Sequence, residues 1–209
     1  MRSFNHATLM TATVGTKTSQ RLPVKLVGDV LPGKTPNRHL VFLHGLFGRA
    51  QSFQFLARAR SIQEQYTCHF VDLCNHGRSA RAPTMGYEVL ARDLRAYLNE
   101  AGILSQTHEK VTLVGHSLGA KTAMAYACLF PDHVDRLVCL DASPVDRREY
   151  PHLNEPTSRM IDDAVKLGSL AGLTKESAIE RIEHAIQDKV LKSALLFNLR
   201  EDGSFMCNL

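Results

Sequence analysis

The sequence predicts an α/β protein that has one mostly parallel β-sheet, helices on both faces of the sheet, and a helical segment after it. Two observations support this fold class. Between residues 39 and 140, short β-branched and apolar runs alternate with segments whose apolar residues recur at helical spacing. Repeated strand and helix units joined by short loops predict parallel strands, with functional loops at their carboxyl ends. From residue 154 onward only helical patterns follow.

Each element is expected from its apolar pattern and the turn residues that bound it. The strands are expected at residues 39–43, 66–73, 110–114 and 134–140. The helices between them are expected at residues 50–61, 87–101 and 120–127. Three further helices are expected at residues 157–170, 175–189 and 190–199, with Thr174 as the N-cap of the second.

The composition is typical of a single globular domain. A chain of 209 residues, of which 44% are hydrophobic, buries a sizeable core without disulfides or metal ions. The net charge of +4 comes from 25 basic and 21 acidic residues without a long basic block, so nucleic-acid binding gains little support. No apolar run reaches the roughly 18 residues that a membrane span needs. The five cysteines form no C-x-x-C pair and the histidines show no zinc spacing, so no metal site is expected.

The first 26 residues leave two interpretations open. They contain Arg2, Lys17, Arg21 and Lys25 but no acidic residue, a composition that suits a mitochondrial targeting segment. Alternatively, residues 22–27 form the first strand of the domain and the protein is cytoplasmic.

The predicted domain organisation has three parts. Residues 1–26 are either a targeting segment or the first strand, residues 27–153 form the core, and residues 154–209 form a helical lid. Helices inserted after a sheet strand are typical of a lid, although they could equally complete the core.

A G-H-S-L-G motif at residues 115–119 predicts a nucleophilic serine. The G-x-S-x-G turn lifts a serine out of a sharp bend between a strand and a helix, and the predicted strand and helix lie on either side of this motif. Glycines beside the serine leave room for the strained bend. Ser117 is therefore the candidate nucleophile, against the alternative of an ordinary serine in a loop.

A serine nucleophile also needs N–H donors for the oxyanion that forms during acyl transfer. The N–H group of Leu118, the next residue, is expected to be one donor. The second is expected from the loop at residues 44–48, with Leu46 as the first choice and Phe47 as the next. We expect His44 to brace this loop and not to act as the base.

The carboxylate that orients the base is expected to be Asp141, at the carboxyl end of the strand that follows the serine helix. The alternative is that Asp141 only caps the turn leading into Pro144. Asp72 also follows a strand, but we expect it to brace the turn at residues 75–77.

Four stretches together carry a resemblance to a known family: residues 44–48, 72–79, 114–124 and 141–145. Through them the chain resembles the α/β-hydrolase family, most closely the esterase group of abhydrolase domain-containing protein 11 and its bacterial relatives. The resemblance implies a serine esterase fold, Ser117 as nucleophile, an ester or lipid-like substrate, and no metal or organic cofactor.

His44, Phe47 and His116 are the expected pocket residues. The resemblance also bears on the acid and the location of the protein. The acid of the bacterial relatives resembles Asp141, whereas other members are assigned an acid further along the chain. Eukaryotic members are typically mitochondrial, which favours the targeting segment.

The chain departs from the family pattern in its base. Such enzymes carry a histidine after the final strand, but the histidines after Ser117 are His133, at a turn, and His152 and His184, in the predicted lid. We therefore expect an α/β-hydrolase core that lacks its final strands and its base, and little activity from these 209 residues alone. The alternative is a non-catalytic binding or regulatory protein of the same fold, and lipase or thioesterase activity remains open.

Overall fold

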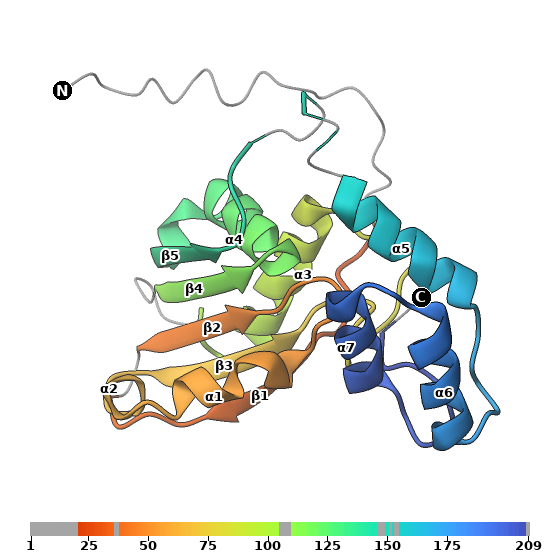
Figure 1. Ribbon diagram of the computed structural model, residues 1–209. Helices are drawn as coiled ribbons and strands as arrows, with labels where there is room; N and C mark the ends of the chain where they lie inside the picture. Colours follow the sequence, from red (N-terminus) through yellow and green to blue (C-terminus); the bar gives the residue numbers. More distant parts are fainter. Residues whose placement is uncertain are drawn as a thin grey trace.

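The computed structural model describes residues 21–35, 38–104, 110–145, 149–150, 152 and 155–207. Its centre is a five-stranded sheet with the strand order β1-β3-β2-β4-β5 (Figure 1). The strands are β1 (Val27–Leu31), β2 (His39–Leu43), β3 (Thr67–Asp72), β4 (Val111–His116) and β5 (Val134–Leu140). Only β1 is antiparallel to its neighbour, and the other pairs are parallel. The predicted α/β class with a mostly parallel sheet is confirmed.

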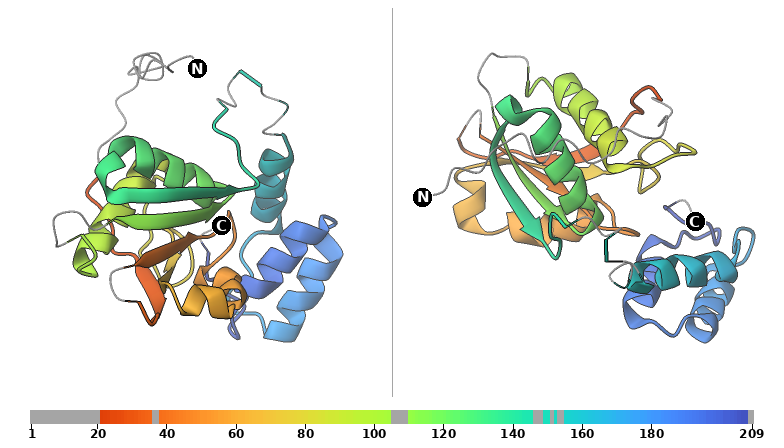
Figure 2. Two further views of the ribbon diagram at one scale, coloured as in Figure 1. Left: turned by 90° about the vertical axis from the view of Figure 1, so that its left-hand side faces the viewer. Right: turned by 90° about the horizontal axis from the view of Figure 1, so that it is seen from above.

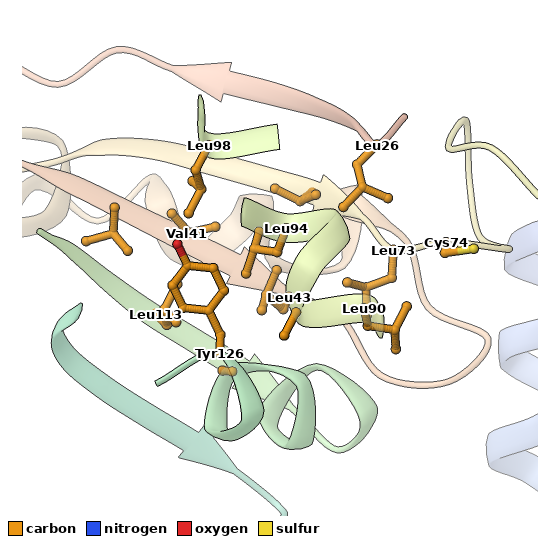
Figure 3. Packing of buried hydrophobic residues seen from close by; sticks show 14 of the residues in the cluster. Leu26, Val41, Leu43, Leu73, Cys74, Leu90, Leu94, Leu98, Leu113 and Tyr126 are labelled. Atoms are coloured by element: carbon orange, nitrogen blue, oxygen red, sulfur yellow. The ribbon is translucent and has the colours of Figure 1, made fainter. Parts of the chain in front are cut away.

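One face of the sheet is covered by α3 (Tyr87–Glu100) and α4 (Leu118–Leu129). Their apolar residues meet those of the strands in the main core, where Figure 3 shows Leu94 of α3 and Tyr126 of α4 against Val41 and Leu113. All four side chains are fully buried. This burial fixes the strand that precedes α4, and with it the turn at residue 117.

The opposite face is covered by η1 (Ala50–Phe53), α1 (Gln54–Ala57) and α2 (Arg60–Gln63). The sequence predicted one helix over residues 50–61, and this prediction is wrong in detail. Phe53 stacks its ring on Phe42 of the sheet with centroids 5.4 Å apart. The chain then becomes extended at Ala59 (ψ 127°) before α2 begins. Packing of Phe53 and the return of the chain to the sheet interrupt the helix.

The first strand begins later than residue 22, which the sequence suggested as one possibility. Residues 21–26 are not a strand, but they pack onto the domain: Arg21 pairs with the buried carboxylate of Asp93 at 2.6 Å, and Leu26 is in the core. The rest of the proposed targeting segment, residues 1–20, lies outside the described residues.

The three C-terminal helices are α5 (Glu155–Leu167), α6 (Lys175–Ala185) and α7 (Lys189–Asn198). Thr174 is the N-cap of α6, as predicted, since its side chain accepts a hydrogen bond from the N–H group of Ser177. α6 ends earlier than predicted because Asp188 caps α7 by accepting from Leu191 N–H at 2.8 Å. Among the described residues, no helix has the length and apolar character that a membrane crossing requires.

These helices pack around their own apolar cluster, which includes Ile182, Leu191, Leu195 and Phe47 from the sheet domain. Figures 1 and 2 show them beside the carboxyl ends of the parallel strands. We keep the name lid for residues 155–207, after the prediction from the sequence.

β5 forms one edge of the sheet. Its residues Leu137, Val138 and Leu140 are 38%, 41% and 37% exposed, although they are apolar and lie in a strand. No described strand pairs with the outer side of β5.

Candidate active site

Backbone strain is concentrated at the carboxyl edge of the parallel strands. The non-glycine residues of the described chain that have positive φ are Phe47 (58°), Asn75 (67°), Ser117 (48°) and Asp141 (52°). They follow β2, β3, β4 and β5, one after each parallel strand. Such residues are uncommon and cluster at functional sites. The candidate site therefore lies where the fold class predicted it.

Ser117 lies between β4 and α4 with φ 48° and ψ −110°. Its N–H group donates to the carbonyl oxygen of Leu140 at 3.0 Å, which ties the bend to the end of β5. A Cβ atom on Gly119 would collide with the carbonyl group of Leu43, and one on Gly115 would collide with the backbone of Gly119 and Ala120. The strand, strained turn and helix that the motif predicted are all present.

A cleft of about 390 Å³ brings Ser117 together with Leu46 and Leu118. Leu118 is the first residue of α4, so its N–H group has no partner within the helix. The loop at residues 44–48 packs directly against the serine, because a Cβ atom on Gly45 would lie 3.4 Å from Cβ of Ser117. Both first-choice donors are thus located beside the candidate nucleophile.

Phe47, the second choice for the loop donor, has its N–H group engaged by Nε2 of His76 at 3.2 Å. Its side chain is buried in the lid cluster and does not line the cleft. Of the two donors that the sequence offered, the geometry favours Leu46.

His44 is buried beneath the same loop, with both ring nitrogens bonded to the backbone. Nε2 accepts from Leu73 N–H at 3.0 Å, so Nδ1 carries the proton and donates to the carbonyl of Gly45 at 2.8 Å. Burial lowers the pKa of His44 to about 3, which keeps the ring neutral. His44 braces the loop, and it does not line the cleft as the pocket prediction implied.

His76 is a structural residue of the site that the sequence did not single out. Its Nδ1 donates to the carbonyl of Cys74 at 2.9 Å, while Nε2 holds Phe47. Burial lowers its pKa as well. The sequence did contain a signal, since His76 stands beside Gly77 in the turn that directly follows a predicted strand. From the sequence alone, that turn is considered only as the segment that Asp72 braces.

Asp72 braces the turn after β3, as predicted. Its carboxylate accepts from Ala50 N–H at 2.6 Å and from Arg78 N–H at 3.1 Å. A Cβ atom on Gly77 would collide with this carboxylate. The hydrogen bonds join the loops after β2 and β3.

Asp141 directly follows β5, and its neighbour Leu140 accepts the hydrogen bond from Ser117. Its side chain is 88% exposed, and Oδ2 lies 3.8 Å from Nε2 of His116, the residue before the nucleophile. His116 was predicted as a pocket residue, but it does not line the cleft. The fold therefore places a carboxylate next to the serine turn, directly after the edge strand β5.

The histidines after Ser117 have other positions. His133 precedes β5, at the end of the sheet opposite Ser117, and its Nδ1 lies 3.1 Å from the hydroxyl of Tyr126. His184 lies in the last turn of α6. The ring of His152 contacts that of Tyr150, with centroids 6.3 Å apart. Across the described ranges, no histidine is hydrogen-bonded to the hydroxyl of Ser117.

A strained serine between a strand and a helix, at the carboxyl edge of a mostly parallel sheet, is the arrangement of α/β hydrolases. Residues 38–166 match the family model described as the alpha/beta hydrolase fold, so the chain belongs to this family. The resemblance found in the sequence is confirmed.

Two relatives and one solved structure illustrate the comparison. The chain is 32% identical to the mouse "sn-1-specific diacylglycerol lipase ABHD11" over 189 residues, which cover 90% of this chain and 60% of the relative. It is 39% identical to "Esterase YbfF" of Escherichia coli over 110 residues, 53% of this chain and 41% of the relative. The structure of a "Marine microorganism esterase" aligns with a TM-score of 0.72 and 28% identity, over 88% of this chain and 69% of that one. The chain thus spans at most about 60% of the length of these two curated relatives.

Proposed function

We propose that this protein is a serine hydrolase that cleaves carboxylic esters through an acyl-serine intermediate. The observation that carries the proposal is the strained Ser117 in one cleft with Leu46 and Leu118, whose N–H groups suit an oxyanion. The names of the relatives, which are esterases and a lipase, agree with this chemistry.

In the proposed reaction, Oγ of Ser117 attacks the carbonyl carbon of the ester and gives its proton to a base. The tetrahedral oxyanion accepts hydrogen bonds from the N–H groups of Leu46 and Leu118, and each such donor contributes about 10²–10³-fold to kcat. The alcohol then leaves with the proton from the base. Water attacks the acyl-serine in the same way, which releases the carboxylic acid and restores Ser117.

We propose that the base is a histidine on an additional strand paired with the outer edge of β5. Two observations support this position. The apolar residues Leu137, Val138 and Leu140 of that edge are exposed, and Asp141 presents its carboxylate on the same side as the serine turn. A histidine ring there would lie between an orienting carboxylate and the nucleophile, as the triad requires.

The lining of the cleft supports an ester with an apolar acyl group. Besides the serine and its donors, the lining includes the apolar residues Met85, Tyr87 and Ile161, and Lys121 and Thr157 are its further polar side chains. Thr157 and Ile161 come from α5 of the lid. Apolar walls with few polar groups are typical of sites for small lipid-like ligands.

A fluorophosphonate probe, which reacts only with an activated serine, tests the proposal. We expect strong labelling of a longer chain that carries the additional strand and histidine, little labelling of the 209-residue chain, and none of either form with Ser117→Ala. Robust hydrolysis of p-nitrophenyl butyrate by the 209-residue chain would rule out the proposed position of the base. No labelling of either form would favour a non-catalytic binding protein.

We further propose that the acid-free segment before Arg21 directs the protein to mitochondria. The ion pair of Arg21 with Asp93 supports a boundary near residue 20, since residues from 21 onward pack on the domain. A fusion of residues 1–20 to a fluorescent protein should accumulate in mitochondria, and a cytoplasmic distribution would favour the alternative.

A further inference from the structure

We infer that Asn198, at the end of α7, is a positioning residue that aims the oxyanion donor Leu46 from the lid. The inference rests on the proposed function. Asn198 is fully buried, and its side-chain amide nitrogen donates to the carbonyl oxygens of Phe47 at 2.5 Å and Ala194 at 2.8 Å. The first of these bonds joins the lid to the loop at residues 44–48, which packs against the nucleophile.

The orientation of this amide is fixed by its neighbours. Two carbonyl oxygens face it, and only the NH₂ group can donate to both. Oδ1 of Asn198 is buried without a hydrogen-bond partner. A buried acceptor of this kind costs about 1–3 kcal/mol, a cost that an apolar side chain packed beside Leu191 and Leu195 of the lid cluster would avoid. The two donated bonds therefore give the best account of an asparagine here.

The first bond reaches Leu46 through two rigid peptide units. A trans peptide is planar, and its C=O and N–H groups point in opposite directions. Asn198 holds the Phe47 carbonyl, and the N–H group of the same unit, on Gly48, donates to the carbonyl of Gly45 at 2.9 Å. The Gly45 carbonyl shares its peptide unit with the N–H group of Leu46. Fixing the Phe47 carbonyl thus fixes the direction of the Leu46 donor.

The loop is held from the sheet side by two histidines, His44 at the Gly45 carbonyl and His76 at Phe47 N–H. Phe47 has the unfavourable φ of 58°, so the loop keeps this conformation only while its neighbours hold it. Asn198 holds the loop from the side of the lid, through its hydrogen bond to the Phe47 carbonyl. Arg49 adds a second link to α7, with its guanidinium carbon 3.7 Å from the ring centroid of Phe197.

The test compares Asn198→Leu with Leu195→Ala, with exchange and thermal midpoint measured in the 209-residue chain and kinetics in the longer chain that carries the additional strand and histidine. Asn198→Leu keeps the branched shape and the number of heavy side-chain atoms, removes the donors and removes the unpaired oxygen. Leu195 is a fully buried residue one turn earlier in α7, so Leu195→Ala weakens lid packing and leaves the hydrogen bond to Phe47 in place. The readouts are amide hydrogen exchange of residues 45–48, kcat and KM for p-nitrophenyl butyrate, and the thermal midpoint.

For Asn198→Leu we expect exchange at Gly48 to become about 10-fold faster and kcat to fall about 10–100-fold at nearly unchanged KM. The thermal midpoint should change little, because the unpaired Oδ1 is removed while the Phe47 carbonyl loses its donor. Leu195→Ala should lower the midpoint and keep kcat and the exchange at temperatures well below it. Unchanged exchange in Asn198→Leu overturns the inference. So does an equal loss of kcat in Leu195→Ala, which would make lid stability the cause. If the longer chain without either substitution hydrolyses nothing, the proposed function fails, and the exchange at Gly48 still decides whether Asn198 holds the loop.

Discussion

Oδ2 of Asp141 lies 3.8 Å from Nε2 of His116, on the flank of the serine turn. The carboxylate is 88% exposed, so the contact contributes little to stability, about 0–1 kcal/mol for a surface pair. Asp141 has a positive φ of 52° and no buried partner in the described structure. A strained, exposed carboxylate beside a candidate nucleophile is better explained by chemistry than by folding.

Asp141→Asn should therefore lower the activity and leave the stability of the protein almost unchanged. In a form that carries the base, we expect kcat to fall about 10²–10⁴-fold, because the histidine loses the carboxylate that orients it. The free energy of unfolding should change by less than about 1 kcal/mol. Asp135→Asn is the matched control, since Asp135 is an exposed residue at the other end of β5. Equal activity of the two variants would show that Asp141 only caps its turn.

Ser117→Gly should abolish hydrolysis and still stabilise the protein. Glycine adopts φ 48° without the strain of a side chain, so we expect the free energy of unfolding to rise by about 1 kcal/mol. Ser193→Gly, at an exposed position inside α7, should instead lower it by about 0.5–1 kcal/mol. Urea denaturation measures both, and a destabilised Ser117→Gly would argue that the bend is not strained.

Stability should fall as the pH is lowered from about 6.5 towards 4. Burial lowers the pKa of His44 to about 3 and of His69 to about 4, and it also lowers the pKa of His76. Because the unfolded chain binds protons at these residues near pH 6.5, unfolding takes up protons in this window. Each histidine then adds a slope of about 1.4 kcal/mol per pH unit.

Urea denaturation at several pH values checks this slope. His69→Gln should lower the slope by the contribution of about one proton. His184→Gln is the matched control, because His184 is exposed. A stability that does not depend on pH between 4.5 and 6 would contradict the neutral buried histidines.

Ile161→Asp should discriminate against long acyl chains. Ile161 of α5 lines the cleft and is 41% exposed, so an apolar acyl group would lose roughly 1–2 kcal/mol of contact and KM would rise about 10-fold. The acetyl ester should be nearly unaffected. Val190→Asp is the control, because Val190 is 70% exposed on α7 and does not line the cleft. An equal effect on the KM of acetyl and octanoyl esters would show that Ile161 does not contact the acyl group.

The features that the sequence predicted correctly are local. The turn at Ser117 could be predicted because its strand, glycines and helix are contiguous in the chain. β1 could not be located so well, because Gly28, its second residue, weakens the strand pattern. The glycine is needed there, since a Cβ atom at residue 28 would collide with the hydroxyl of Tyr97.

The other errors in the predicted structure came from contacts between segments that are far apart in the sequence. The helix expected over residues 50–61 is broken because Phe53 packs on the sheet. The bonds from His76 and Asn198 to Phe47 join loops that no local pattern connects. The residues that shape the candidate oxyanion loop therefore became visible only in three dimensions.

The bond between Asn198 and Phe47 spans 151 residues of sequence. Contacts of such long range form late in folding, because the chain must first close the loop between them. During synthesis the sheet and the serine turn emerge well before residue 198 does. On our proposal, a nascent or partly folded chain then holds Ser117 beside a donor loop that is not yet fixed. The order of synthesis thus delays the fixing of the donor loop, and with it the full esterase activity that we propose, at least until α7 has docked.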